Sequence, residues 1–520
     1  NDKNDIEPRR LLFGDYLLYI LRKPLINDEK PSSSIRVTIL EILARYAYTK
    51  ENRIGPEISK PTQNIFRNRL MSSFTHLLTD LEQHGFVCDL LKKFEPTAVE
   101  MDSNIKNVKS NSETILHKIQ KKLKKSNDDE KILLQAMSLL YSLTIFQLYN
   151  GDPEAISCLG ELDLCYQKLI RKKKEQECDG QVVQVLVEVL LSLISRPSRL
   201  LRKVAQFVFG AFVSHMTEGG LKLMIDILET SESLGGQQTL FDTENDYESS
   251  LDETDNHMGS DIEVIDMNAD EGTFFNQTSE EGSAESEDDI SENFDSSEET
   301  ERLNSALASI LGTNIDTVAE IEDDVDMTDS EMFTLDDKLA EVFLQRKREL
   351  RKNKEQRHAK ENICNFKTRV LDLIDIFFKT QAHNELAFQL ILPLLRLMRT
   401  TKSKNLLDKS HKIIHTFVKA YKKMPSRHQL SKSTLSGRLE LLKNIHEEAS
   451  KDSSHSFCKA ATSASLLVVS SIYYVDAKVI KKISNVYRDT QVRWILGQSN
   501  IQASFFTEWI NWCQSHISSS

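Results

Sequence analysis

Two histidines have a spacing that could bind a metal ion. His411 and His415 lie four residues apart and would share one face of a helix, the spacing at which paired imidazoles bind zinc. Lys412 stands where a metalloprotease of that kind carries its glutamate, and the surrounding residues are cationic. We therefore expect ordinary surface histidines here and no metal site.

Three carboxylates, Asp323, Asp324 and Asp326, could resemble a two-metal cluster. They lie in a segment with the composition of disordered chain, where nothing would hold them in catalytic geometry. The sequence also contains no P-loop, GxGxxG or GxSxG motif. We therefore expect no catalytic residue and no cofactor.

Basic residues are the most informative side chains. Residues 396–443 hold thirteen Lys or Arg against only Asp408 and Glu440. On stacked helices such residues would form a ridge that neutralises phosphates in a salt-dependent, sequence-independent way, although a solvated helix face gives the same pattern. The candidate nucleic-acid contacts here are Arg396, Arg399, Lys402, Lys404, Lys409, Lys412, Lys419, Lys422 and Lys423.

A second basic stretch, residues 346–360, has eight cations in fifteen residues. A helix with so few apolar residues cannot be buried, so it must project, bridge, or lie on a partner such as RNA. Its candidate contacts are Arg346, Lys347, Arg348, Arg351 and Lys352.

Two shorter signals concern import and modification. The run Arg171, Lys172, Lys173 and Lys174 either complements the dipole at a helix C-terminus or serves nuclear import, and we favour import. Ser286 and Ser296 precede acidic residues, the context that an acid-directed kinase prefers, although such sites arise by chance in acidic tracts.

The segments that carry these residues have the sequence pattern of helices. Apolar residues recur at helical spacing from about Arg9 to Glu229 and again from Thr334 to Gln514, while strand signals are almost absent. Val182–Leu193 is rich in β-branched residues, but its length favours a buried helix. Many consecutive helices without a sheet predict an all-α, armadillo/HEAT-like helical-repeat solenoid, interrupted by a long acidic disordered segment.

Charge divides the chain into three parts. Residues 241–337 hold 33 Asp and Glu against the single Arg302, whereas the remaining residues carry a net charge of +19. We predict an N-terminal helical-repeat region at 1–234, an acidic disordered insert at 235–333 and a C-terminal helical-repeat region at 334–520, with Thr334 as a helix N-cap.

Length and composition set further bounds. The first residue is Asn1 rather than Met, so we expect a piece of a longer protein. Seven cysteines at irregular spacings argue against a disulfide framework and for a reducing compartment. The most apolar run, Ala464–Val475, is much shorter than the roughly 20 residues that cross a bilayer, so we expect no membrane partner.

Three runs resemble the DNA polymerase phi family, which is called DNA polymerase V in fungi and Myb-binding protein 1A in animals. They span about 75 residues and are Leu335–Phe343 (LDDKLAEVF), Asn365–Phe377 (NFKTRVLDLIDIF) and Leu390–Leu407 (LILPLLRLMRTTKSKNLL). Around them come helical repeats, the acidic tract and more basic helices, in the family's order. We expect a fungal member, present as a fragment.

The resemblance implies a nuclear, chiefly nucleolar protein that acts in ribosomal RNA transcription and large-subunit assembly. Its partners would be ribosomal DNA or pre-ribosomal RNA, and ribosome assembly factors or transcription regulators; we expect the acidic insert to contact basic proteins. The family name suggests a B-family-like DNA polymerase, but the chain lacks the Tyr-x-Asp-Thr-Asp motif of such enzymes. The alternatives are therefore that polymerase and an importin-type transport receptor, and we expect a non-enzymatic scaffold.

The run Asn365–Phe377 and the residue after it can be either an interface or a packed core. Phe366, Val370, Leu371, Ile374 and Phe378 share one helix face, which favours the core. Arg369 and Asp372, three residues apart, would then form an ion pair with each other.

Overall fold

A computed structural model describes residues 3–23, 31–50, 57–78, 85–126, 128–169, 180–241, 329–423, 432–474 and 477–517. These ranges contain helices and connecting turns, and no strand. The predicted all-α helical-repeat fold is confirmed. The centre of the predicted insert, with the carboxylates Asp323, Asp324 and Asp326, lies outside the described residues.

The first half of the chain forms successive helices with short connections. Side-chain caps start several of them: Ser59 accepts from the amide of Thr62, and Asp102 accepts from that of Ile105 at 2.7 Å. The helices are α1 Lys3–Arg22, α2 Pro31–Tyr48, α3 Lys60–Leu77, α4 Gly85–Leu91, α5 Ser103–Leu123, α6 Asp128–Tyr149, α7 Glu154–Leu169, α8 Gly180–Ser195, α9 Arg199–Phe212, η2 Val213–His215, α10 Glu218–Glu229 and α11 Leu234–Phe241.

Two apolar helices form the middle of this half. Helix α8 is the buried helix predicted for Val182–Leu193, with Leu186, Val187 and Leu190 fully buried. Within α6, Glu130–Tyr149 is long and apolar enough to cross a membrane by length and composition, and 78% of its most apolar window is buried inside the fold. A core helix of a repeat stack has the same character, so this segment gives only weak evidence of a membrane.

The second half begins with one very long helix. Helix α13 spans Asp329–Thr380 without a break, so the expected start at the N-cap Thr334 is wrong and Thr334 lies inside the helix. The later helices are α14 Glu385–Gln389, α15 Ile391–Thr400, α16 Lys404–Lys422, α17 Lys432–Ala449, α18 His455–Tyr473, η4 Ala477–Val479, α19 Ile480–Ile495 and α20 Ala503–Ile517.

The helices belong to two compact units. Residues 1–231 and 364–520 form the first, and residues 232–363, with α11 and most of α13, form the second. The boundaries predicted at 234 and 334 stay predictions, although α11 already occupies the first residues of the predicted insert.

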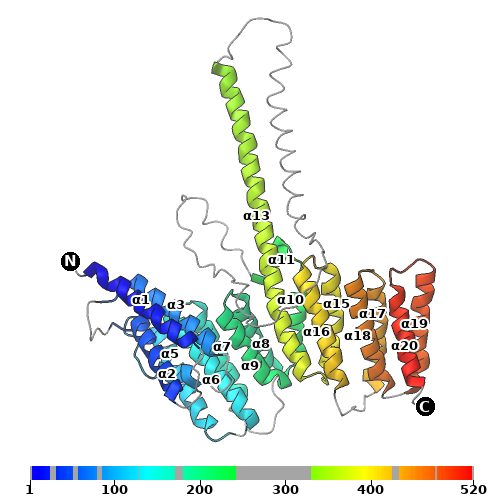
Figure 1. The fold of residues 1–520 in the computed structure, drawn as a ribbon, viewed down its shortest axis with the longest axis horizontal. Helices are drawn as coiled ribbons and strands as arrows, with labels where there is room; N and C mark the ends of the chain where they lie inside the picture. The colour runs from blue at the N-terminus through cyan, green and yellow to red at the C-terminus, as the bar shows by residue number, and fades with distance from the viewer. Residues whose placement is uncertain are drawn as a thin grey trace, which may run out of the picture. The chain divides into compact units, whose positions relative to one another are not determined.

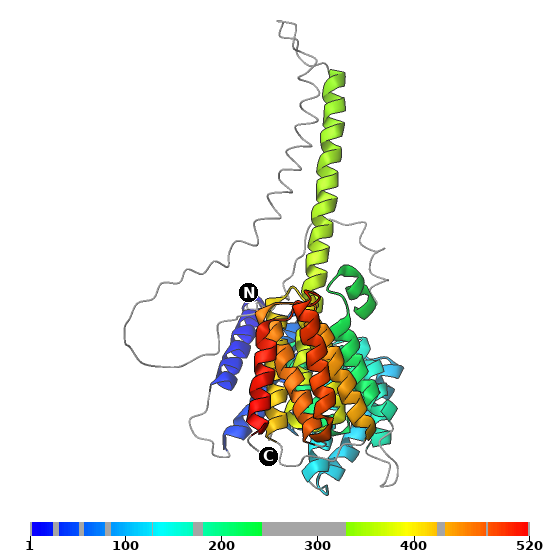
Figure 2. The same ribbon diagram turned by 90° about the vertical axis from the view of Figure 1, so that its right-hand side faces the viewer.

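Within the first unit, helices pack as pairs in a stack that runs from α1 to α20 (Figure 1). In its C-terminal part, α15, α17 and α19 pack in one series, while α16, α18 and α20 pack in another. Seen from this end, the last helices of the stack, orange to red, run side by side (Figure 2). Because α10 packs against α15, the stack continues directly from the first half of the sequence to the second.

Arg369 on α13 ties the two halves of this unit together. Its Nη1 donates to the carbonyl oxygens of Ile194, Ser195 and Arg196 at 2.8, 2.9 and 2.8 Å. Those of Ile194 and Ser195 are helix-end carbonyls of α8, while that of Arg196 also accepts from the Ser198 amide. The expected Arg369–Asp372 pair is wrong, because Asp372 instead binds Lys409 of α16 at 2.5 Å.

The same turn of α13 is packed core. Phe366, Val370, Leu371, Ile374 and Phe378 are all buried, which confirms the core interpretation of this face. The Phe378 ring stacks on that of Phe417 in α16 with centroids 4.3 Å apart. The region that carries the family resemblance therefore holds the stack together.

A buried histidine lies between the last helices. The Nδ1 and Nε2 of His446 in α17 lie 2.9 Å from Thr490 Oγ1 and 3.1 Å from Ser465 Oγ, and the rings of Tyr487 and Phe505 meet it edge-on. Burial, with the charge of Arg493, lowers the pKa of His446 to about 3. The imidazole is therefore neutral in the folded protein.

Replacing Arg369 by Gln should lower the free energy of unfolding by about 3 kcal/mol, because the charged bonds to three carbonyls are lost inside the packed joint. Urea unfolding measures the change. Lys379→Gln on the same helix is the matched control, since its exposed pair with Asp375 contributes little. A loss below about 1 kcal/mol for Arg369→Gln would contradict the role of this joint.

His446 should make stability depend on pH. Its folded pKa of about 3 lies below the value of 6.5 in unfolded chain, so only the unfolded state takes up a proton between these values. The stability is fully present above pH 6.5 and falls by about 1.4 kcal/mol per unit below it. His446→Gln should flatten the curve between about pH 6.5 and 5.5, whereas the exposed control His455→Gln should not; equal slopes would refute the assignment.

Candidate nucleic-acid interface

The predicted cations of α13 belong to the second unit. Arg346, Lys347, Arg348, Arg351 and Lys352 are all exposed. The ion pair of Arg351 with Glu355, at 2.9 Å, joins successive turns of the same helix. These side chains are therefore accessible, as the composition of the stretch predicts.

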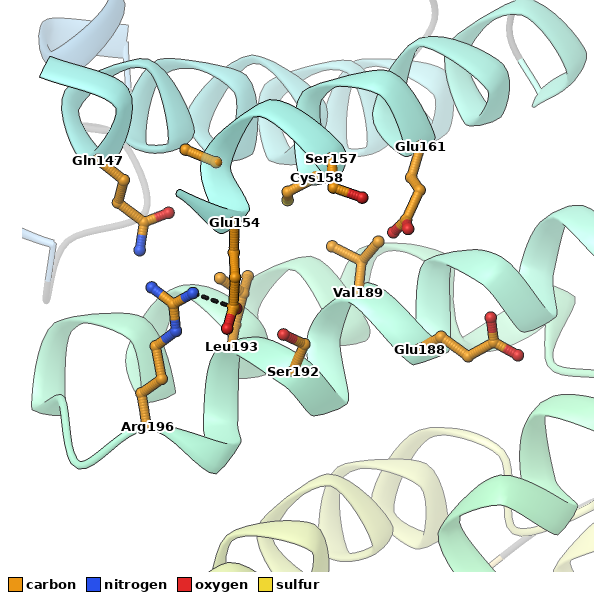
Figure 3. A pocket seen from close by; sticks show the side chains of 11 residues that line it. Gln147, Glu154, Ser157, Cys158, Glu161, Glu188, Val189, Ser192, Leu193 and Arg196 are labelled. Atoms are coloured by element: carbon orange, nitrogen blue, oxygen red, sulfur yellow. Dashed lines mark hydrogen bonds and ion pairs between the residues drawn. The ribbon is translucent and has the colours of Figure 1, made fainter. Parts of the chain in front are cut away.

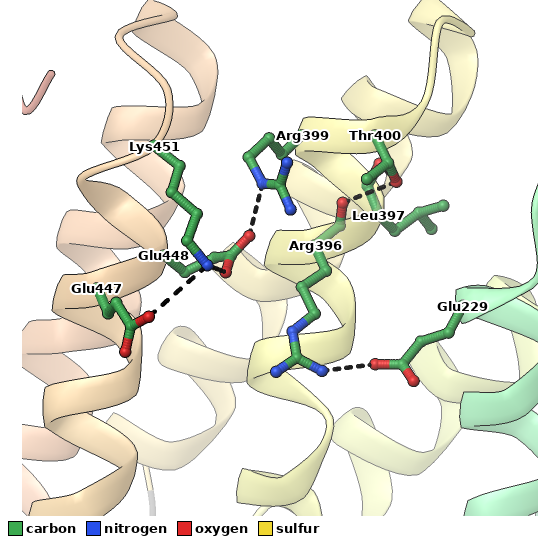
Figure 4. A network of polar contacts seen from close by, with 8 residues as sticks. All are labelled: Glu229, Arg396, Leu397, Arg399, Thr400, Glu447, Glu448 and Lys451. Atoms are coloured by element: carbon green, nitrogen blue, oxygen red, sulfur yellow. Dashed lines mark hydrogen bonds and ion pairs between the residues drawn. The ribbon is translucent and has the colours of Figure 1, made fainter.

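Three predicted cations of the first unit have structural partners. Arg396 pairs with Glu229 of α10 at 2.9 Å, and Arg399 pairs with Glu448 of α17 at 2.6 Å (Figure 4). Lys409 donates to the carbonyl of Thr368 at 2.7 Å as well as to Asp372. These three residues join helices, and carboxylates of neighbouring helices offset their charges, although Arg396 and Arg399 are themselves exposed.

Glu448 shows how such a pair is held. Its side chain is only 5% exposed, and Lys451 binds its second oxygen at 2.9 Å (Figure 4). Burial raises the pKa of Glu448, but the bonds from Lys451 and Arg399 outweigh burial and lower it. Both cations thus keep a buried carboxylate charged.

The other predicted cations face solvent. Lys404 is exposed, and Lys402, Lys412, Lys419, Lys422 and Lys423 are exposed and form no ion pair with any described residue. Lys412, Lys419 and Lys422, here called the lysine row, recur at intervals of seven and three and share one face of α16. The opposite face buries Leu406, Ile413 and Phe417.

One further lysine and one group of three were missed by the sequence analysis. Lys459 at the start of α18 is exposed, and its charge acts on His411, which places a cation of α18 beside α16. Lys118, Lys121 and Lys125 are exposed on and just after α5. Lys459 was missed because it is a lone cation in an apolar helix. The α5 lysines lie in an acid-free run from Thr114 to Asn127, and that run is the signal that could have found them.

His411 and His415 form part of the same cationic surface. Burial, with the charges of Lys459 and His415, lowers the pKa of His411. Within the described ranges, no three His, Cys, Asp or Glu residues gather in a group that could hold a metal ion. The two histidines add hydrogen-bonding groups beside the lysine row.

A cavity of about 320 Å³ lies between α6, α7 and α8 (Figure 3). At one end Arg196 bonds to Asp152 and Glu154. At the other, Glu161 faces Glu188, and burial together with the Glu188 charge raises the pKa of Glu161. Burial also raises the pKa of the Cys158 thiol to about 11, so this sulfur is not an activated nucleophile.

Several predicted sites lie outside the described residues. They are the import candidates Arg171, Lys172, Lys173 and Lys174 and the phosphorylation candidates Ser286 and Ser296.

Comparison with known proteins gives a consistent set of relatives. The family model described as DNA polymerase phi matches residues 1–378. The rDNA transcriptional regulator pol5 of Schizosaccharomyces pombe is 30% identical over 98% of this chain and 54% of its own length. The rDNA transcriptional regulator POL5 of Saccharomyces cerevisiae is 25% identical over 99% of this chain and 53% of its own.

An animal relative is similar over a shorter region. Myb-binding protein 1A of Homo sapiens is 30% identical over 54% of this chain and 22% of its own length. The chain spans about half the length of the two yeast relatives. No solved structure matches it.

Mutagenesis should distinguish the cations that join helices from the exposed lysines of the row by their effect on stability. Arg399→Gln removes the 2.6 Å bond to the buried Glu448 and should lower the free energy of unfolding by about 1–3 kcal/mol. Lys419→Gln, on the exposed row, should change it by less than about 0.5 kcal/mol. Urea unfolding of both variants provides the comparison, and equal losses would show that Lys419 is also structural.

Proposed function

Because the chain belongs to the DNA polymerase phi family, we propose that it regulates transcription of ribosomal DNA as a helical scaffold in the nucleus. Two yeast relatives that align with almost the whole chain are named rDNA transcriptional regulators, which supports this role. The aligned chain is about half of each relative, so the proposal concerns the share of that activity carried by these repeats.

One observation carries the nucleic-acid part of the proposal. The lysine row projects from α16 while its neighbours Arg396, Arg399 and Lys409 are used in joints between helices. Lysines without ion-pair partners that recur on one helix face suit phosphate neutralisation with release of counterions. Such contacts fix the position of a duplex or strand without reading its sequence.

The remaining assignments extend this core proposal. The exposed cations of α13, Arg346 to Lys352, provide a second phosphate-binding surface for ribosomal DNA or pre-ribosomal RNA. The acidic segment contacts basic proteins, and the protein acts in the nucleolus in large-subunit assembly together with assembly factors. Arg171–Lys174 serves import, and Ser286 and Ser296 accept phosphate.

We propose no enzymatic activity for the chain. The relatives that cover most of it are named regulators, although the family name contains the word polymerase. Positioning of nucleic acid and partner proteins on helical repeats requires no catalytic group.

Replacing two lysines of the row should weaken binding in a salt-dependent way. For Lys419→Gln/Lys422→Gln, the slope of log K against log salt for a DNA duplex should become shallower by about 2, since each lost phosphate contact removes about one unit. Fluorescence anisotropy over a salt series measures the slope. Lys481→Gln/Lys482→Gln on α19, also exposed, is the control with the same change of charge.

The same pair of variants tests the role in cells. Lys419→Gln/Lys422→Gln should reduce occupancy of ribosomal DNA and change nascent ribosomal RNA synthesis, while the α19 control should not. Unchanged duplex binding in the row variant would remove the nucleic-acid part. Normal ribosomal RNA synthesis after depletion of the whole protein would contradict the regulatory role.

A further inference from the structure

Cations from two other helices meet at the end of α3 in the first unit. Helix α3 packs against both α1 and α9. Arg22, in the last turn of α1, donates through Nη2 to Ser72 Oγ at 3.3 Å, and Lys203 of α9 donates through Nζ to the carbonyl of Thr75 at 3.0 Å. Both charges therefore approach the last turns of α3, which also carry His76.

Arg199 adds a third permanent charge. It precedes Lys203 by four residues on α9, so the two side chains share one helix face. Arg199 is exposed and forms no ion pair with a described residue. Arg22, His76, Arg199 and Lys203, from three helices, are here called the α9 cluster.

Folding alone does not account for Arg199. It is the first residue of α9, a helix of 14 residues, and the first turn holds no acidic residue. The helix dipole makes the N-terminal end positive, so a cation there is unfavourable by some tenths of a kcal/mol or more. Nearby, Ser198 Oγ caps the helix by accepting from the amide of Leu201 at 3.3 Å. The arrangement concentrates positive potential that an anion would relieve.

The pKa shifts of His76 and Lys203 agree with a positive electrostatic potential at this site. Burial, followed by the charges of Arg22, Lys203 and Arg199, lowers the pKa of His76, although its place in the last turn of a helix favours the protonated form. Burial and Arg199 lower the pKa of Lys203.

We propose that the α9 cluster binds a phosphate of a nucleic-acid backbone, as a contact point separate from the lysine row. Arg22 and Arg199 offer forked guanidinium donors, Lys203 a point charge and Ser72 a hydroxyl, a donor set that matches the several oxygens of a phosphate. The inference rests on the proposed nucleic-acid function and adds a second place where the strand is held.

The position of the cluster favours a long polyanion. The charge of Arg202, next to Lys203, acts on Arg369 of α13. Lys409 of α16 bonds to the carbonyl of Thr368, the residue before Arg369. Helices α9 and α16 therefore flank the same turn of α13, and a ligand with charges repeated along its length can reach cations on both.

Arg199→Gln/Lys203→Gln tests the site directly. The slope of log K against log salt for a DNA duplex and for a single-stranded RNA should become shallower by about 2 on at least one probe, with binding about tenfold weaker at fixed salt. The α19 control Lys481→Gln/Lys482→Gln should change affinity less than about twofold. Thermal unfolding checks the fold, and Arg199→Gln alone keeps the bond from Lys203 to Thr75.

The outcomes separate this site from the lysine row. An unchanged slope in the cluster variant, with a loss in Lys419→Gln/Lys422→Gln, would overturn the inference and leave the proposed function standing. No loss in either variant would contradict both. If the cluster variant loses binding only to poly-glutamate, the site takes an acidic protein and the inference is wrong.

The pKa of His76 provides a measurement that would not change with added nucleic acid if the cluster had only a structural role. Bound phosphate adds negative charge beside the imidazole and should raise its pKa. Histidine-labelled protein, titrated by NMR with and without saturating duplex, should show an upward shift of the His76 titration midpoint. An unshifted midpoint in the presence of bound duplex would contradict phosphate binding at this site.

Discussion

The bonds from Arg369 to the end of α8 are the constraint on which the first unit depends. A helix end inside a packed stack leaves carbonyl oxygens that must find donors, and Arg369 donates to two of them, those of Ile194 and Ser195, and also to the carbonyl of Arg196. Since Arg369 follows the acidic segment and α8 precedes it, the contact closes a loop of about 175 residues. Helices α10 and α15 pack against each other in the same unit, so the stack continues across this joint.

The cations of the first unit fall into two classes, according to whether they contact carboxylates of neighbouring helices or solvent. Arg396, Arg399 and Lys409 bond to carboxylates of neighbouring helices and hold the layers together. The lysine row is exposed on α16, and in the α9 cluster Arg22, His76 and Arg199 are exposed while Lys203 is half-buried. A basic composition therefore serves two purposes, and only side-chain geometry separates the cations that stabilise the fold from those available to phosphate.

The sequence predicted what depends on local periodicity. The buried helix α8 and the packed face from Phe366 to Phe378 were both expected and are confirmed. The role of Arg369 was not accessible, because its carbonyl partners lie far away in the sequence and backbone carbonyls carry no residue-specific signal. The start of α13 was misplaced because Thr334 has the residue type of an N-cap within a charged helix that continues through it.

Cleavage of the folded chain within residues 242–328, followed by size-exclusion chromatography in about 0.5 M salt to screen exposed charges, tests the central claim that residues 1–231 and 364–520 form one unit. The packed joint between α8, α10, α13 and α15 predicts that the two fragments elute together as a single species. Elution as two separate folded fragments would contradict the account.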